Sequence, residues 1–441
     1  MIRKALALVL ACSCVALAAP PALAETPEAQ GPVSTQTWIH AGRLIAVPGQ
    51  PPRGASTIVV QDGRIVAVHD GFQPAPAGAA TIDLRSRTVL PGLIDSHTHL
   101  SSDRAGNEGL AAAMTDSLPL ASYETYWNAT KTLHAGFTTV RNLGDEHGKV
   151  LALREAIRRG WVIGPRIVDA GESISTTGGH MDGRVGLAEE VEPLIGTENL
   201  CDGIDDCRRA VRRQVGRGAD VIKIATTGGV NSGTGLATRM FEDEARALID
   251  TAHAYGRKVA VHAHGLDGIK LAVRLGADSI EHGTMIDEEA ARMMAKNGTF
   301  YVPTLSTVNG YIERLAANPN AYSPAVRAQI DWRIGITGKS LRIAYPLGVR
   351  IAYGTDAGVS KHGRNADEFE LLVKFGMPPA EAIKAATVNA AELLGLSKET
   401  GTIEVGKSAD IIAVDGDPLA DVRVLKAMKF VMARGEVVVG P

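Results

Sequence analysis

Apolar and polar residues alternate at both ends of the chain with the two-residue period of half-buried strands. Between residues 33 and 88 the pattern runs through WIHAGRLIAV, STIVVQDGRIVAV and ATIDLRSRTVL, and Gln61-Asp62-Gly63-Arg64 has the composition of a hairpin turn. The segments ADIIAVDGDPL and KFVMARGEVVV repeat the pattern near the other end. We therefore predict one small composite β-sandwich domain built from residues 33–88 and 396–441.

The middle of the chain, residues 89–395, alternates short apolar runs with helix-like stretches. Eight of these runs have the composition of buried strands, and the helix-like stretches tend to close with a glycine before the next run. Eight alternating strand–helix units predict an α/β fold, a (β/α)8 TIM barrel. The active site of such a barrel lies at the carboxyl ends of its strands.

The first 24 residues have the features of a secretory signal peptide. Arg3 and Lys4 precede an apolar run, and Ala22-Leu23-Ala24 supplies a small-residue cleavage site. A lipoprotein signal ending at Cys12 or Cys14 is the alternative. No other stretch is long and apolar enough to span a bilayer, so we predict a periplasmic or secreted protein without membrane attachment after processing.

Composition and charge limit the classes of function that the chain could have. Hydrophobic residues make up 45% of the 441 residues and charged residues 22%, as in soluble globular proteins. The formal net charge of −3 gives no reason to expect a nucleic-acid partner. Cys201 and Cys207, six positions apart, could close a loop disulfide in an oxidising compartment, and two unpaired thiols are the alternative.

Potential metal ligands follow several of the predicted strands. His97 and His99 are two positions apart at the end of the first strand, so their imidazoles point the same way. The other polar residues near strand ends are Lys223 on the fourth strand, His262 and His264 on the fifth, His282 on the sixth and Asp356 on the eighth. Imidazoles together with a carboxylate suit zinc or a similar divalent ion.

Two of these residues have additional roles open to them. Lys223 lies in a buried strand, where an ammonium group is costly unless it is paired, reaches solvent or is converted to a carbamate that bridges two metals. Asp356 could bind a metal and carry a proton between the attacking water and a leaving amine. The alternative for Asp356 is a helix N-cap.

The sequence says least about substrate binding. His180 follows the third predicted strand, Arg141 ends the second, and His362 lies in the loop after the eighth. Arg141 could hold a substrate carboxylate, or it could form a structural ion pair with Asp145 or another acid. His180 and His362 could contact the substrate or could be loop histidines with internal partners.

This combination of residues resembles the amidohydrolase superfamily over nearly the whole chain. The motifs TTVRNLGD, TGGH, KIATTGGV, AVHAHG, IEHG and YGTDAG are similar to the Xaa-Pro dipeptidase and amino-acid carboxypeptidase branch. Bacterial and fungal ochratoxin-hydrolysing amidases are similar to that branch too. The resemblance implies a binuclear zinc site bridged by N6-carboxylysine at Lys223 and a hydroxide. One ion would be held by His97, His99 and Asp356, and the other by His262 and His282.

The resemblance also gives His264, the second histidine of HAH, a role on the substrate side of the site. It implies a hydrolase that releases a C-terminal amino acid from a dipeptide or an N-acyl amino acid, ochratoxin-type amides included. The alternatives are a cyclic-amide hydrolase or a deaminase of the same superfamily, and a zinc-binding protein without catalysis. A homo-oligomer is expected on the same basis.

Overall fold

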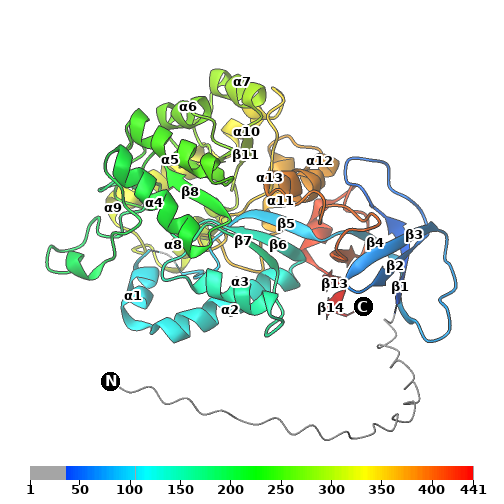
Figure 1. Cartoon of the computed structure of the whole chain (residues 1–441). Helices are drawn as coiled ribbons and strands as arrows, with labels where there is room; N and C mark the ends of the chain where they lie inside the picture. The colour runs from blue at the N-terminus through cyan, green and yellow to red at the C-terminus, as the bar shows by residue number, and fades with distance from the viewer. Residues whose placement is uncertain (1–35, 105, 441) are drawn as a thin grey trace, which may run out of the picture. The chain divides into compact units, whose positions relative to one another are not determined.

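The computed structural model describes residues 36–104 and 106–440, and the predicted signal peptide lies outside these residues. The described residues form one compact unit. Strands and helices alternate through its middle part (Figure 1). In the described part of the chain, no helix has both the length and the apolar character needed to cross a membrane.

A seven-stranded sheet combines both ends of the chain, in the order β14-β13-β12-β4-β1-β2-β3. Its strands are β1 (Thr37–Leu44), β2 (Ser56–Gln61), β3 (Arg64–Asp70), β4 (Ala80–Pro91), β12 (Ile411–Val414), β13 (Phe430–Ala433) and β14 (Glu436–Val439). Hydrogen bonds connect all seven strands, because the long strand β4 pairs with β1 on one side and β12 on the other. The predicted domain boundaries stay a prediction.

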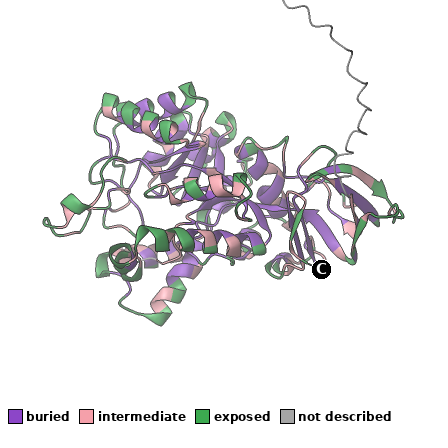
Figure 2. Ribbon diagram, turned by 60° about the horizontal axis from the view of Figure 1, so that its bottom comes forward, coloured by how far each residue is buried: buried purple, intermediate pink, exposed green. Residues whose placement is uncertain are grey.

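Two parallel sheets occupy the middle of the chain, ordered β5-β6-β7 and β11-β10-β9-β8. Their strands are β5 (Leu93–Thr98), β6 (Phe137–Asn142), β7 (Arg166–Asp169), β8 (Val221–Ala225), β9 (Lys258–Ala263), β10 (Ser279–His282) and β11 (Phe300–Val302). Nearly every residue of these strands is buried, and they lie beneath the surrounding helices in Figure 2. The predicted alternation of parallel strands and helices is therefore confirmed.

Helices follow most of the parallel strands. They are α1 (Asn107–Thr115), α2 (Leu118–His134), α3 (Lys149–Arg158), α4 (Ile204–Arg217), α5 (Glu242–Ala254), α6 (Leu266–Arg274), α7 (Glu288–Asn297), α8 (Thr307–Ala317), α9 (Pro324–Gly335), α10 (Lys339–Ala344), α11 (Asp367–Lys374), α12 (Pro379–Lys384) and α13 (Ala390–Leu393), with the short turns η1 (Glu192–Leu194), η2 (Ala385–Asn389) and η3 (Val422–Lys426). Helix α7 shows the expected end signals: the Asp287 side chain accepts a hydrogen bond from the Ala290 amide, and Gly298 ends the helix in the left-handed conformation.

The eighth predicted strand, around Ile351–Asp356, is present as an extended segment with a single bridge between Ile351 and Tyr301. The Tyr353 amide donates to the carbonyl of Ala385 instead of to a neighbouring strand, which interrupts the ladder. The segment still approaches β5 closely: a Cβ added at Gly354 would lie 3.0 Å from the Cβ of His97. The end of this segment is thereby held beside the end of β5.

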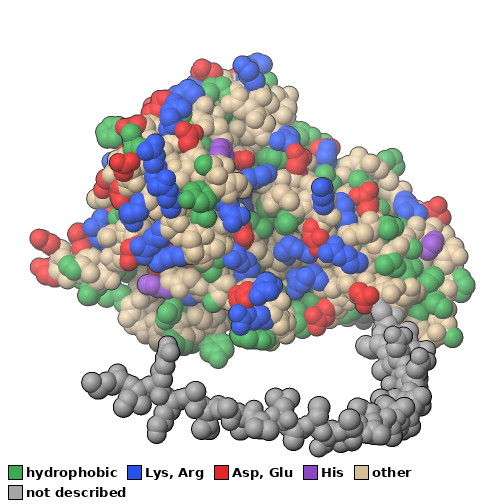
Figure 3. All heavy atoms as spheres, in the orientation of Figure 1, with side chains coloured by type: hydrophobic (Ala, Val, Ile, Leu, Met, Phe, Trp, Pro, Cys, Tyr) green, Lys and Arg blue, Asp and Glu red, His purple; other side chains and the backbone are tan. Residues whose placement is uncertain are grey.

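Charged side chains of both signs are interspersed over the face shown in Figure 3. Cys201 and Cys207 are joined by a disulfide, so the predicted pairing is confirmed.

Candidate metal centre and active site

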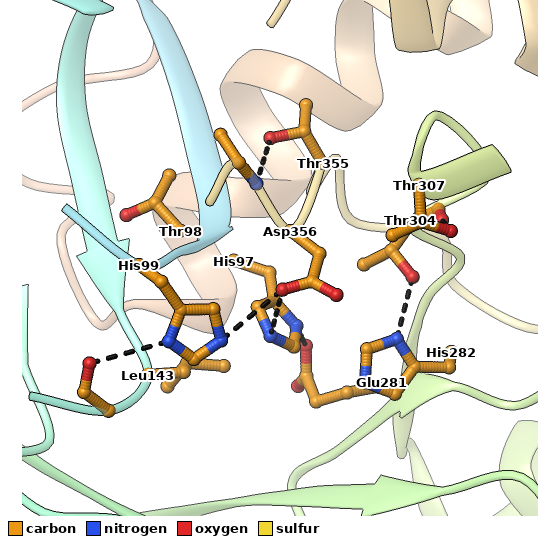
Figure 4. Close-up of polar contacts among 12 residues, drawn as sticks. His97, Thr98, His99, Leu143, Glu281, His282, Thr304, Thr307, Thr355 and Asp356 are labelled. Carbon is orange, nitrogen blue, oxygen red and sulfur yellow. Dashed lines mark hydrogen bonds and ion pairs between the residues drawn. The ribbon is translucent and has the colours of Figure 1, made fainter. Parts of the chain in front are cut away.

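Three predicted ligands meet where β5 ends. His97 and His99 leave β5 on the same side, and Asp356 reaches them from the segment that follows Gly354 (Figure 4). The Asp356 Oδ1 atom lies 3.2 Å from His99 Nε2 and 3.6 Å from His97 Nε2. We call His97, His99 and Asp356 the first ligand group.

A second ligand group consists of His262, His264 and His282, from the ends of β9 and β10. Within each group the candidate ligand atoms lie within 4.8 Å of one another. The two groups adjoin, because the ring centroids of His97 and His282 are 5.0 Å apart. The structure therefore brings together all five histidines and the aspartate that the sequence placed near strand ends.

Each of these five imidazoles uses one ring nitrogen to contact the protein. The partners are Glu281 for His97 Nδ1 (2.8 Å), the Gly144 carbonyl for His99 Nδ1 (3.3 Å), the Gly228 carbonyl for His262 Nε2 (3.1 Å), Thr284 Oγ1 for His264 Nδ1 (2.7 Å) and Thr304 Oγ1 for His282 Nδ1 (2.7 Å). Such contacts fix the orientation of a metal-binding histidine and leave its other nitrogen for the ion.

The residues present fit divalent metal ions. The Nε2 atom of His97 is buried and has no hydrogen-bond partner, which is unfavourable unless something else binds it. Burial lowers the pKa of His97 to about 4, so the ring is neutral at physiological pH and can donate a lone pair. Burial opposes ionisation of Asp356, but the charges of His97 and Lys223 and the His99 contact lower its pKa to about 2. Neutral imidazoles and an ionised carboxylate are the ligand forms that zinc requires.

Lys223 lies on β8, and its charge influences residues of both ligand groups. Its side chain is buried, and none of the described carboxylates forms an ion pair with its ammonium group. Its charge acts on His97 and Asp356 of the first group and on His262 and His282 of the second. Burial, with the charge of Arg141, lowers the pKa of Lys223 to about 8, although Glu281 and Asp356 oppose the shift.

Backbone strain is concentrated at the same place. His282, Thr304 and Asp356 have φ angles of 66°, 48° and 57°, a left-handed conformation that residues other than glycine rarely adopt. His282 and Asp356 are candidate ligands. Thr304 is not, but its hydroxyl contacts the His282 ring and so fixes the orientation of that ring. Strain of this kind persists where the surrounding structure enforces it and is common at functional sites.

Arg141 does not join the ligand groups. Its guanidinium donates to Glu281 Oε1 at 2.8 Å and to Ser279 Oγ at 3.1 Å, and the residue is 2% exposed. This geometry favours the structural ion pair that the sequence left as the alternative, with Glu281 as the partner in place of Asp145. Because Glu281 also binds His97, Arg141 supports the metal centre from inside the fold.

His180 and His362 take different positions. His180 stacks on His262 with ring centroids 4.1 Å apart, so it borders the second ligand group. Gly229 makes this approach possible, since a Cβ there would lie 2.1 Å from the His180 ring. His362 instead contacts the His99 carbonyl at 3.1 Å and Thr132 Oγ1 at 3.1 Å, which is a supporting contact behind a ligand.

Sequence reasoning missed two charged residues that the structure places beside the site. Glu281 directly precedes His282 on β10, and a search for the last polar residue of each strand passes over it. Arg333 lies in α9, far along the chain from any of the motifs, and is 3% exposed. Arg333 is recognised only when each buried charged residue is checked for an ion-pair partner, which requires the structure.

Comparison with known proteins agrees with the resemblance to the amidohydrolase superfamily that the sequence motifs indicated. The amidohydrolase family model matches residues 88–438. The chain is 32% identical to the ochratoxinase of Aspergillus niger over 448 aligned positions, covering 96% of this chain and 89% of that protein. A Xaa-Pro dipeptidase solved with bound methionine in its active site is 38% identical, with a TM-score of 0.87 and coverage of 91% of this chain and 99% of that one. A prolidase solved in complex with N-methylphosphonate-L-proline is 32% identical, with a TM-score of 0.83 and coverage of 92% and 100%.

The matched residues span the whole candidate metal centre, from His97 to Asp356. The chain therefore belongs to the amidohydrolase family, in the branch of the Xaa-Pro dipeptidases and ochratoxin-hydrolysing amidases, and is a metal-dependent hydrolase that acts on amide bonds.

Proposed function

We propose that the protein is a binuclear zinc hydrolase that releases the C-terminal amino acid from dipeptides or N-acyl amino acids, ochratoxin-type amides included. The observation that carries the proposal is the presence of two adjoining ligand groups together with a buried Lys223 that has no ion-pair partner among the described residues and whose charge acts on both groups. The names of the relatives support the substrate class, because ochratoxin hydrolysis, methionine binding and a phosphonate analogue of a proline dipeptide all involve an amino acid with a free carboxylate.

His97, His99 and Asp356 would hold one ion, and His262 and His282 the other. Ring orientation supports the choice of His262 over His264: the planes of His262 and His282 are inclined by 70°, whereas those of His264 and His282 are nearly parallel at 14°. Imidazoles bind an ion through lone pairs in the ring plane, and two parallel rings direct theirs at one point less readily than two inclined rings. His264 then faces the substrate.

Lys223 would be carbamylated and would bridge the ions. Carbamate formation needs a neutral amine, and the pKa of about 8 provides a substantial neutral fraction near pH 7.5. The conversion would also replace an unpaired buried cation by an anion that two cations neutralise. Both effects favour the modified side chain at this position.

When bound, two divalent ions would acidify a water molecule and polarise the substrate carbonyl. Asp356 would accept the proton of the attacking water and deliver it to the departing amine. Its low pKa keeps the carboxylate ionised and ready to accept that proton. His264 and His180, which border the second ligand group, would contact the substrate beside the scissile bond.

The larger architecture supports this proposal. We infer that the two parallel sheets and the segment 350–356 close into a (β/α)8 barrel, because bridges join Ile174 to Ile224, Tyr301 to Ile351 and Thr98 to Ala357 at their edges. The ligand groups then lie at the carboxyl ends of the strands, where barrel enzymes have their active sites. A periplasmic or secreted location and assembly into a homo-oligomer are proposed on the sequence arguments given above.

Amino-acid release by the zinc-loaded protein tests the function. The substrates are Xaa-Pro, Xaa-Arg, Xaa-Lys, Xaa-Phe and Xaa-Leu dipeptides and N-acyl phenylalanines including ochratoxin. We expect strong turnover of one group and loss of that turnover in Asp356→Asn. Absence of turnover on every substrate with two metals bound, or full activity of a metal-loaded Asp356→Asn variant, would refute the proposal.

A further inference from the structure

Helix α9 carries an arginine that has no counter-ion. Arg333 is 3% exposed, and the only hydrogen bond of its guanidinium among the described residues is donated by Nη1 to Thr337 Oγ1 at 3.1 Å. No carboxylate of the described chain forms an ion pair with it. A buried cation is unfavourable unless an anion pairs with it, and Arg141, the other equally buried arginine, has Glu281 as its partner.

The packing around α9 connects this helix to segments that adjoin the candidate metal centre. Ile330 packs in one cluster with Val230 and Tyr311, and Val359 lies against that cluster. Val230 follows the loop whose Gly228 carbonyl holds His262, and the Val359 amide donates to the carbonyl of Asp356. The helix therefore packs in one cluster with the segment that contacts His262 and the segment that follows Asp356.

A second set of contacts leads from Arg333 to His264. Ser340, three residues beyond Thr337, donates its hydroxyl to the Thr284 carbonyl at 2.7 Å, and Thr284 Oγ1 contacts His264 at 2.7 Å. After burial itself, the charge of Arg333 is the largest influence that lowers the pKa of His264. The negative charges of Asp356 and Glu368 act in turn on Arg333. The guanidinium is thus on the His264 side of the centre, where the substrate is expected.

We propose that Arg333 binds the free carboxylate of the amino acid that is released, and that it restricts the enzyme to substrates with a carboxylate beside the scissile amide. This inference rests on the proposed function, since it assumes that the amide is cleaved at this centre. A guanidinium can form two parallel hydrogen bonds with one carboxylate, which fixes the orientation of the ligand as well as its charge.

The proposal predicts that the enzyme distinguishes a free C-terminal carboxylate from a C-terminal carboxamide. A substrate whose C-terminus is a carboxamide would leave Arg333 buried without an anion, whereas the free acid supplies one. Neutral substrates of cyclic-amide hydrolysis or deamination would be disfavoured for the same reason. A charge-assisted hydrogen bond of this kind corresponds to a preference of about 100-fold in kcat/KM for the acid over the amide.

The test compares N-benzoyl-L-phenylalanine with N-benzoyl-L-phenylalaninamide in the zinc-loaded wild type and in Arg333→Gln. We expect the wild type to prefer the acid by about 100-fold in kcat/KM, and Arg333→Gln to lose most of that preference through a rise in KM for the acid. Arg333→Lys should restore part of it. Arg327→Gln is the matched control, because Arg327 lies on the same helix but is half-exposed and pairs with Asp331.

Binding of products keeps this inference separate from the proposed function and from a folding defect in the variant. Calorimetry of the zinc-loaded wild type with L-phenylalanine, L-methionine and L-proline, each against its amide, requires no hydrolysis. Tighter binding of the acids would support the role of Arg333 even if no substrate is turned over. Equal binding of acids and amides, or equal losses on both benzoyl substrates in Arg333→Gln, would overturn it.

Discussion

The histidines of this site are each oriented by a contact from one ring nitrogen, which leaves the other nitrogen for a metal ion. His97 shows this most clearly: Nδ1 contacts Glu281, and Nε2 is buried without a partner beside Asp356. Glu281 in turn accepts from Arg141 and Ser279. One buried carboxylate therefore orients a candidate metal ligand and pairs with a buried guanidinium at the same time.

Replacement of Glu281 by glutamine should weaken metal binding. An amide has one acceptor oxygen in place of two, so it can serve His97 or Arg141 but not both. We expect about a 10–100-fold loss of zinc affinity, measured by competition with a chelator. Glu288→Gln, an exposed substitution on α7, is the control. If Glu281→Gln folds and binds zinc as tightly as the control, the proposed orienting role is wrong.

At the scale of elements, buried acids connect the segments that carry the ligands. Asp95 on β5 accepts from the Thr355 amide and hydroxyl and from Asn365, which joins β5 to the eighth segment beside Asp356. Glu368 on α11 accepts from the amides of Leu305 and Ser306 at 2.9 and 2.6 Å, close behind Thr304. These contacts hold the strained backbone at Thr304 and Asp356 in place.

Glu368 should make folding stability depend on pH. Burial raises its pKa to about 7, although the Leu305 and Ser306 amides oppose the shift. A carboxyl whose pKa is higher in the folded state stabilises fully below the unfolded value of about 4.5, and this contribution is lost as the pH rises through 7. The wild type should lose about 3 kcal/mol of unfolding free energy from this group between pH 4.5 and 7.5.

Glu368→Gln removes that titration. Urea unfolding at pH 5 and pH 8 should show a flatter pH dependence for the variant than for the wild type, whatever the absolute cost of the substitution. Glu370→Gln on the same helix, at a partly exposed position, should retain the slope of the wild type. A Glu368→Gln variant with an unchanged slope would show that the group does not titrate in this range.

At the scale of the whole molecule, sequence periodicity predicted which segments are strands and how helices alternate with them. It also predicted that the chain ends share one β region, because the two-residue period is visible in each strand alone. It did not predict that β4 connects the two ends of the chain by pairing with both β1 and β12, since this double pairing is a long-range property. Nor could it predict the interruption at Tyr353, whose amide bonds to the distant Ala385.

The clustering of the candidate ligands was predictable for a related reason. His97 and His99 are two positions apart in sequence, and the remaining candidate ligands lie near the ends of strands that a parallel fold brings to one edge. Arg141 also lies near the end of a strand, but its guanidinium reaches Glu281, and the direction of a long side chain is set by partners that sequence spacing does not reveal. Arg333 comes from a helix whose position depends on tertiary packing alone.

The central claim is that two ions and a carbamylated Lys223 form one centre. Diffraction from crystals of the zinc-loaded protein, with anomalous data collected at the zinc absorption edge, tests it directly. The account predicts two anomalous peaks roughly 3.5–4 Å apart, one at each ligand group, with electron density extending from Lys223 Nζ to both. One peak only, or two peaks with an unmodified Lys223 and His264 as a ligand, would contradict it.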